Sequence, residues 1–207
     1  MNWRFSSTAL EQIHTLIHIV SPSAFETAMS TYLSDEWRKK GLSVYSDILG
    51  NLYADYNGGG KKHVAIVAHM DTVMMQVTNI LPSGMLKFRS CGANPYLLLG
   101  QAVLVQGNDL QYHGVIGYDP ISQYEKGLTD EDLWIDIGMD SQDEVERFIS
   151  IGNPVVYSPR LSCLNSKYLC GTAIDDRIGL FILNQCIDIQ NEKKIPVGLP
   201  DRDRPED

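Results

Sequence analysis

The stretch that decides the fold is His63-Val64-Ala65-Ile66-Val67-Ala68-His69-Met70-Asp71. Residues 63–68 form a continuous run dominated by apolar side chains, which is typical of a strand covered on both faces in an α/β sheet. His69 and Asp71 follow at its carboxyl end, where ligands tend to bind in open α/β sheets. The stretch therefore predicts an α/β fold and marks a candidate functional site.

Two helices are predicted before this strand. Apolar side chains recur at helical spacing over residues 10–20, and Ser21-Pro22 ends the run because the residue before a proline disfavours helical backbone. Ser23, with Glu26 three residues later, matches a capping box and is expected to open the second helix. The buried stripe of that helix is expected to contain Phe25, Met29, Leu33 and Trp37.

Residues 73–162 have a different character, because short β-prone runs alternate there with glycine, proline and polar breaks. This spacing predicts a small all-β or barrel-like unit, with one short helix near residues 142–149 opened by Ser141. After Cys170 the helical pattern returns, and residues 180–189 have the composition of a buried helix. The β-prone runs cover residues 85–89, 103–106, 114–117, 133–138 and 154–157.

The order of these patterns is explained most economically by an insertion into one domain. We expect residues 1–72 and 163–192 to form the first and second parts of a catalytic-type α/β domain, and residues 73–162 to form an inserted β-barrel domain used in oligomerisation. Residues 193–207 form a divergent tail. Its three prolines and its charged run cannot supply the interior strand that an α/β domain needs next.

The composition excludes some classes of partner. The chain has 207 residues and a formal net charge of −9, so we expect neither a nucleic-acid nor an anionic-membrane partner. No apolar run approaches the ~20 residues of a membrane span, and the amino terminus lacks the pattern of a signal peptide. The four cysteines have no C-x-x-C spacing and are expected to be reduced, mostly buried thiols of a cytoplasmic protein.

His69 and Asp71 are the first pair of residues that could carry chemistry. Two residues apart on an extended strand end, their side chains point to the same side. The imidazole can bind a divalent metal through one nitrogen while a carboxylate holds its other N–H. The alternative interpretation is a polar strand end that meets a loop.

Asp175-Asp176-Arg177 is the second candidate. Two adjacent carboxylates after an apolar run are costly to bury unless a metal or a cation compensates them. Asp175 could bridge two metals while Arg177 pairs with the other carboxylate. The alternative is an N-cap aspartate and a solvated charge at the start of a helix.

Other catalytic signatures are incomplete. His14 and His18 have a spacing that can chelate zinc on a helix, but Thr15 replaces the glutamate of the zinc-protease pattern. Ser21-Pro22-Ser23 is not surrounded by the glycines of a nucleophile elbow. His14 and His18 are therefore expected to be solvated or boundary residues.

The two aspartate-containing motifs are more specific together than either is alone. The sequence resembles the glutamyl aminopeptidase, or tetrahedral aminopeptidase, family of dinuclear metallopeptidases, some of which have been labelled cellulase M. The order and spacing of the motifs agree from about residue 8 to residue 189, with one small departure at Ala24, where the family usually carries glycine. The matching stretches are residues 21–26, 47–52, 68–71, 114–117, 136–138 and 173–179.

The resemblance implies a mixed-sheet, zinc-peptidase-like catalytic domain with an inserted, PDZ-like β-barrel. It implies that His69 binds one metal and that Asp175 bridges two divalent ions, zinc or cobalt. Asp71 is the candidate catalytic residue that would support His69, and the Asp175–Asp176 peptide bond would be cis. The implied reaction removes N-terminal residues from peptide substrates. The family assembles as dimers and then dodecamers.

The chain also departs from the family in a way that bears on activity. The family carries a Glu-Glu pair, which supplies the general base and a metal ligand, and later Asp and His ligands. None of these can be placed in this sequence. We therefore expect a truncated catalytic domain with weak or partial metal binding, since catalytic zinc sites typically use about three protein ligands. Because the base and several ligands are missing, the chain alone is expected to be inactive. Its sheet would have an open edge and an uncovered apolar face, so the chain is also expected to be poorly stable.

Two other functions are compatible with parts of this sequence. The first is a non-catalytic oligomerisation or interaction protein, because the β insert that the family uses for dimer contacts is intact. The second is a glycoside hydrolase, following the cellulase label. That chemistry needs two carboxylates on either side of the sugar bond, and the neighbours Asp175 and Asp176 could not take those positions.

Overall fold

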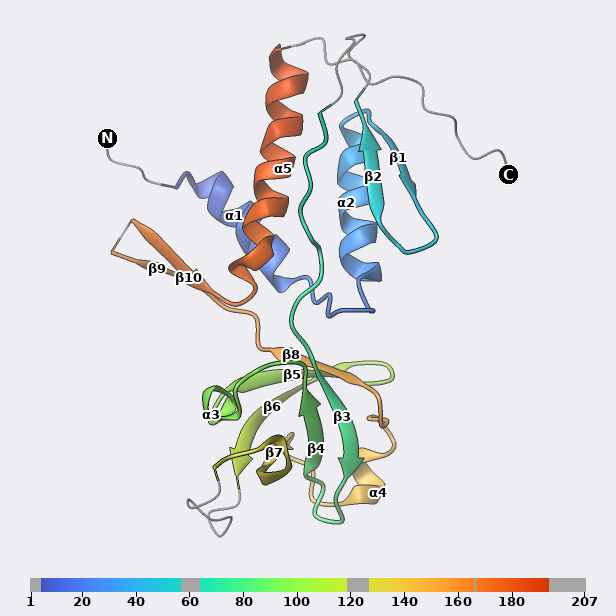
Figure 1. Ribbon diagram of the computed structural model, residues 1–207, viewed down its shortest axis with the longest axis vertical. Coiled ribbons are helices and arrows are strands. Elements are labelled where there is room, and N and C mark those ends of the chain that lie inside the picture. The colour runs from blue at the N-terminus through green and yellow to red at the C-terminus, as the bar shows by residue number, and fades with distance from the viewer. Residues whose placement is uncertain (1–4, 57–63, 119–126, 166, 194–207) are drawn as a thin grey trace.

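The computed structural model describes residues 5–56, 64–118, 127–165 and 167–193. Figure 1 shows two lobes. The first, which we call the helical lobe, contains an extended segment at residues 64–72 beside its helices and a two-stranded sheet. The second lobe is a closed β-barrel. The elements of the helical lobe are α1 (Ser7–His18), α2 (Thr27–Lys39), β1 (Ser43–Ser46), β2 (Leu52–Asp55) and α5 (Ile174–Lys193).

The two predicted amino-terminal helices are confirmed. Helix α1 begins after Ser6, whose side-chain oxygen accepts a hydrogen bond from the backbone N–H of Ala9 at 3.1 Å. Both helices bury an apolar stripe, as their periodicity predicts, and Leu16 of α1 packs in one core with the stripe of α2. The stripes consist of Ile13, Leu16 and Ile17 on α1 and of Met29, Leu33 and Trp37 on α2.

The predicted capping box at the start of α2 is wrong. The N-cap residue is Glu26, which makes no side-chain capping bond, and Ser23 lies outside the helix. Phe25 also precedes the helix and is 45% exposed, so it does not belong to the buried stripe. The reason is a tight turn, in which the backbone N–H of Phe25 donates to the carbonyl of Pro22 at 2.8 Å and Ala24 has φ +70°. A positive φ at the third residue is what a type II turn requires.

The predicted buried strand at residues 63–68 is wrong as well; His63 itself lies outside the described residues. Within the described part of the chain, residues 64–71 form no strand, and the only ladder contact nearby is a parallel bridge between Pro22 and Thr72. Val64, Ile66 and Val67 are 66%, 55% and 87% exposed. A strand needs hydrogen-bonded neighbours, and β1 and β2 pair only with each other.

Helix α5 joins the carboxyl-terminal part of the described chain to α1 and α2. The Trp37 indole N–H donates to the Asn184 side-chain oxygen at 2.7 Å, and both groups are buried. Leu180 and Ile187 contribute to the core, whereas Ile182 is 51% exposed. The expectation of a buried helix at residues 180–189 is therefore correct for one face only, because nothing described here covers the other.

The predicted barrel is confirmed as a closed six-stranded sheet in the order β3-β4-β7-β6-β5-β8. All its pairs are antiparallel. Short helices connect some of the strands, and Ser141 caps one of them as predicted. The description of this barrel as PDZ-like, and the division of the chain into domains, stay predictions. The elements are β3 (Met75–Ile80), β4 (Leu86–Ser90), α3 (Pro95–Leu98), β5 (Ala102–Gln106), β6 (Gln111–Tyr118), η1 (Asp130–Asp132), β7 (Leu133–Asp136), α4 (Gln142–Val145) and β8 (Pro154–Tyr157).

A hairpin that the sequence did not predict, β9 (Leu161–Leu164) and β10 (Tyr168–Gly171), leads from the barrel back to α5. It carries two cysteines, Cys163 and Cys170, both free and exposed. Cys91 is exposed and Cys186 is half-buried. The expectation of mostly buried thiols is therefore wrong, although all four are unpaired. The cause is the exposed position of the hairpin and of the loop after β4.

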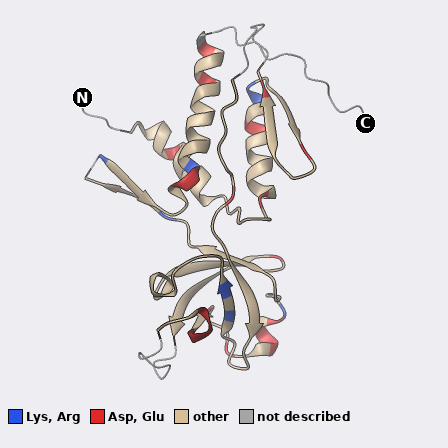
Figure 2. Ribbon diagram, in the orientation of Figure 1, with Lys and Arg blue, Asp and Glu red and all other residues tan. Residues whose placement is uncertain are grey.

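The charged side chains are spread over both lobes. In Figure 2, the Lys and Arg residues of the described ranges lie on several elements and do not gather on one face. No helix in the described ranges is long and apolar enough to cross a membrane. The proposed tail at residues 193–207 lies outside the described residues except for Lys193, which ends α5.

Candidate active site

Three of the predicted site residues meet in the helical lobe. The His69 Nδ1 atom lies 3.0 Å from Oδ1 of Asp71, and its Nε2 atom lies 3.0 Å from Oδ1 of Asp175. Asp175 belongs to a segment 106 residues further along the chain. The fold therefore brings the two sequence motifs together and places one imidazole between two carboxylates.

Ser23 belongs to this site, although sequence reasoning gave it only a capping role. Its hydroxyl donates a short hydrogen bond to Oδ2 of Asp71. The carboxylate of Asp71 therefore accepts the hydrogen bond from Ser23 at one oxygen and contacts the His69 ring with the other. The signal that could have identified Ser23 is its place in the matching stretch at residues 21–26.

The contacts shift the pKa values of both groups. The hydrogen bond from Ser23 and the interaction with His69 hold the pKa of Asp71 below its ordinary value, against the opposing effect of burial. Burial lowers the pKa of His69, but its hydrogen bonds to Asp175 and Asp71 outweigh that effect and raise the pKa. Asp71 is therefore ionised at neutral pH and can orient the ring of His69.

The paired aspartates have separate roles. Oδ1 of Asp176 accepts the backbone N–H of Gly179 at 2.9 Å, and Oδ2 accepts the backbone N–H of His69 at 3.3 Å. Asp176 therefore caps the first turn of α5, which is the alternative interpretation of this motif. The side chain of Asp175 is 95% exposed, and among the described residues its hydrogen-bond partner is His69. The peptide bond between them is cis, as the resemblance implied.

Arg177 does not pair with the second carboxylate, so that expectation is wrong. Its side chain is fully buried, and its guanidinium donates to the carbonyl of Met70 at 2.8 Å, to the carbonyl of Ile19 at 3.1 Å and to the hydroxyl of Ser21. Burial lowers the pKa of Arg177 to about 10, so it remains charged at neutral pH. The guanidinium thus ties α5 to the end of α1 and to the segment that carries His69.

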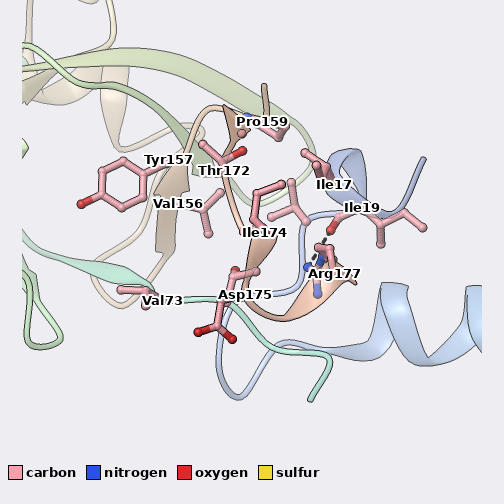
Figure 3. Close-up of a pocket in the computed structure, with 14 residues that line it drawn as sticks. Ile17, Ile19, Val73, Val156, Tyr157, Pro159, Thr172, Ile174, Asp175 and Arg177 are labelled. Atoms are coloured by element: carbon pink, nitrogen blue, oxygen red, sulfur yellow. Dashed lines mark hydrogen bonds between the residues drawn. The ribbon is translucent and has the colours of Figure 1, made fainter. Parts of the chain in front are cut away.

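A cavity of about 340 Å³ opens beside Asp175, where the helical lobe meets the barrel. Figure 3 shows side chains from α1, from the segment after Asp71, from β8 and from the start of α5 around it. Most of them are apolar, so the cavity could hold a hydrophobic group next to the polar site. The lining residues that Figure 3 labels are Ile17, Ile19, Val73, Val156, Tyr157, Pro159, Thr172, Ile174, Asp175 and Arg177.

The described residues do not complete a metal-binding site. His69 and Asp175 are an imidazole and a carboxylate at close range, a donor pair that suits zinc. Among the residues described, however, no group of three or more His, Cys, Asp or Glu side chains is arranged to hold a metal ion. A catalytic zinc ion typically uses about three protein ligands. The chain therefore offers two candidate ligands and lacks the rest of a ligand shell in its described part.

Fold and site together define an α/β protein with an attached β-barrel and an imidazole held between two carboxylates. The model of the M42 glutamyl aminopeptidase family matches residues 50–199, so the chain belongs to that family. SgcX of Escherichia coli (strain K12) is 33% identical over 208 residues, an alignment that covers 94% of this chain and 54% of SgcX. The chain spans about half the length of the curated relatives that it matches.

Two solved structures have the same fold. The TET aminopeptidase from the marine sediment archaeon Thaumarchaeota archaeon superposes with a TM-score of 0.83 at 29% identity, over 91% of this chain and 55% of that one. The Pyrococcus horikoshii TET1 peptidase, which can assemble into a tetrahedron or a large octahedral shell, gives 0.79 at 28% identity, over 90% and 57%. The family expectation is confirmed, and the M42 metallopeptidases as a family use divalent metals.

Proposed function

We propose that this chain carries part of the active site of a metal-dependent aminopeptidase, which removes N-terminal residues from peptides. The observation that carries the proposal is the position of His69 between the carboxylates of Asp71 and Asp175. Membership of the M42 glutamyl aminopeptidase family supports the class of reaction. Because the described residues supply an incomplete ligand set and the chain spans about half of its relatives, we expect no activity from the chain alone.

Each residue of the site has a proposed role. His69 and Asp175 would be metal ligands, and the exposed carboxylate of Asp175 is free to bridge two ions. Asp71 is a positioning residue, because it holds the other nitrogen of His69 and is itself held by Ser23. A divalent metal bound there would polarise the scissile carbonyl and activate a water molecule. The metals that the family resemblance favours are zinc and cobalt.

The test is a p-nitroanilide assay on leucyl and glutamyl substrates with added zinc or cobalt. It compares this chain with a chimera that joins it to the part of SgcX that the alignment does not span. We expect activity from the chimera only. In the chimera, His69→Ala should remove activity, and Asp71→Asn should weaken metal binding by about 10- to 100-fold, measured by calorimetry.

His14→Ala is the matched control, since His14 is exposed on α1 and stacks only on His18. This variant should keep the activity and the metal affinity of the chimera. A folded chimera without activity, or one that is unaffected by His69→Ala, would refute the proposed function.

A second candidate function is non-catalytic oligomerisation. The barrel favours it, because its six strands close around a buried apolar core, so the unit that the family resemblance assigns to dimer contacts is complete. The Pyrococcus horikoshii TET1 peptidase can assemble into a tetrahedron or a large octahedral shell, and we propose that this chain also forms homo-oligomers. Sedimentation velocity of the isolated chain tests this, and a monomer at all concentrations would exclude it.

A further inference from the structure

A second, larger cavity lies where the beginning of α2 faces the barrel. Its volume is about 720 Å³, more than twice that of the cavity beside Asp175, and we call it the interlobe groove. One wall comes from the end of α1, the turn at residues 22–25 and the first turns of α2, and the other from the β5–β6 turn and the start of β8. A volume of this size holds a ligand larger than one side chain. The aromatic, imidazole and carboxamide side chains of the groove are those of His18, Phe25, Tyr32, Gln106, Gln111 and Asn153.

The groove has aromatic rings on one wall and carboxamides on the other. Phe25 and Tyr32 belong to the helical lobe, and Phe25 is 45% exposed. Gln106 and Gln111 are directly opposite each other in the β5–β6 ladder, so their side chains lie on the same face of the sheet. A carboxamide presents N–H donors and a carbonyl acceptor. The two glutamines can therefore pair with the N–H and C=O groups of a peptide main chain.

The groove is uncharged, although the chain has a net charge of −9. Among the described residues that line it, none is Asp, Glu, Lys or Arg. Glu26 lies between two lining residues, but its Oε1 atom is occupied by the backbone N–H of Ala24 at 2.7 Å. The Nδ1 atom of His18 donates to the carbonyl of His14 at 2.8 Å, which leaves Nε2 of the neutral ring as an acceptor. These groups suit a neutral ligand that offers N–H donors.

The groove begins next to the candidate active site. Ser23, whose hydroxyl donates to Asp71, is followed directly by Ala24 and Phe25, and both of these line the groove. Consecutive Cα atoms are only about 3.8 Å apart. Residues 19 and 20 line both the groove and the cavity beside Asp175, so the two spaces share a wall. A peptide whose first residue lies at the site therefore has the groove within reach of its next residues.

We propose that the interlobe groove binds the part of a peptide substrate that follows the residue to be removed. Phe25 and Tyr32 pack against apolar side chains of the peptide, Gln106 and Gln111 pair with its main chain, and Nε2 of His18 accepts one of its N–H groups. The choice of a peptide rests on the proposed function. The groove gives the protein a preference for longer, neutral peptides over substrates of a single residue.

A neutral oligosaccharide is the competing ligand, since hydroxyl groups also donate and accept hydrogen bonds. The position of the groove favours the peptide, because the turn at residues 22–25 joins the groove to the site of a chain that belongs to a peptidase family. The oligosaccharide is therefore an outcome that the experiment must be able to detect.

Calorimetry of this chain with a peptide that an aminopeptidase cannot cleave tests the groove. The probe is a hexapeptide of alternating leucine and serine, acetylated and amidated so that it carries no charge. We expect saturable one-to-one binding, weakened at least about fivefold by Phe25→Ala and about 2- to 10-fold by Gln111→Ala. Phe5→Ala is the matched control and should leave the affinity unchanged, because Phe5 is 42% exposed, precedes α1 and does not line the groove.

Kinetics of the chimera with SgcX separate the groove from the proposed function. Phe25→Ala should raise KM at least about fivefold for the same hexapeptide with a free N-terminal leucine, and should leave kcat/KM for leucyl-p-nitroanilide unchanged. An equal loss with both substrates, no saturable binding of the probe to the chain, or binding of cellohexaose in place of the probe each overturns the groove proposal. Binding of the probe without activity in a folded chimera would refute the proposed function and leave the groove as a peptide-binding site.

Discussion

Replacing Ala24 with glycine should stabilise the helical lobe. Ala24 has φ +70° at the third position of the turn that runs from Pro22 to Phe25, and its side chain is exposed. Left-handed backbone costs an L-residue other than glycine about 1–2 kcal/mol. Glycine removes that cost but loses about 0.5–1 kcal/mol in backbone entropy on folding. We therefore expect Ala24→Gly to stabilise the lobe by about 0.5–1 kcal/mol.

The matched control is the same change four residues later. Ala28 is also exposed but lies within helix α2. There glycine has the entropy cost without relief of any strain, so Ala28→Gly should destabilise the lobe by up to about 1 kcal/mol. Both variants remove the same methyl group from an exposed alanine. The opposite signs expected for the two changes in stability therefore come from the backbone conformation at each position.

Native-state hydrogen exchange of the α2 amides measures the effect, because it reports the free energy of local opening without requiring a two-state melt. Amides around the buried Trp37 should exchange more slowly in Ala24→Gly and faster in Ala28→Gly. Equal destabilisation by both variants would show that the turn does not strain Ala24, and the reasoning would then be wrong.

Three further predictions concern other parts of the molecule. Gly117→Ala should destabilise the barrel by about 1–3 kcal/mol, measured by urea unfolding, because the new Cβ would lie 2.1 Å from the ring of Trp134; no change would mean that the ring moves freely. Hydrogen bonds from Asn51 hold the pKa of Asp47 below its ordinary value, so the stability that Asp47 contributes is present above that ordinary value and is lost as the pH falls through the lowered pKa. Asn51→Ala should move this pKa upward in an NMR titration, and an unchanged pKa would count against the cause. Arg177→Lys should cost about 1–3 kcal/mol in thermal melts, since an ammonium cannot reach all the acceptors that the guanidinium fork joins; a neutral effect would contradict that role.

The features predicted correctly are those that local periodicity controls. The apolar stripes of α1 and α2 and the alternating runs of the barrel are visible in short windows, and the structure contains them. The strand at residues 63–68 failed for the opposite reason. An apolar run specifies that a segment is suited to a sheet interior, but a strand forms only where neighbours supply hydrogen bonds.

The capping box failed because a distant partner competed with a local one. Ser23 and Glu26 have the right spacing, yet the hydroxyl of Ser23 donates to Asp71, 48 residues away. Arg177 shows the same effect, since its acceptors are the backbone of Ile19 and Met70 and not the adjacent carboxylate. Such contacts depend on how segments pack, and no short pattern encodes them.

The sequence by itself determined which residues could do chemistry. His69, Asp71 and Asp175 were identified from residue type and motif, and their family resemblance gave them roles. Only the tertiary structure decided that the imidazole lies between two carboxylates, that Asp176 caps α5 and that Val64, Ile66 and Val67 are exposed. The physical reason is that a side chain's identity is local, whereas its partners and its exposure are set by segments about a hundred residues away.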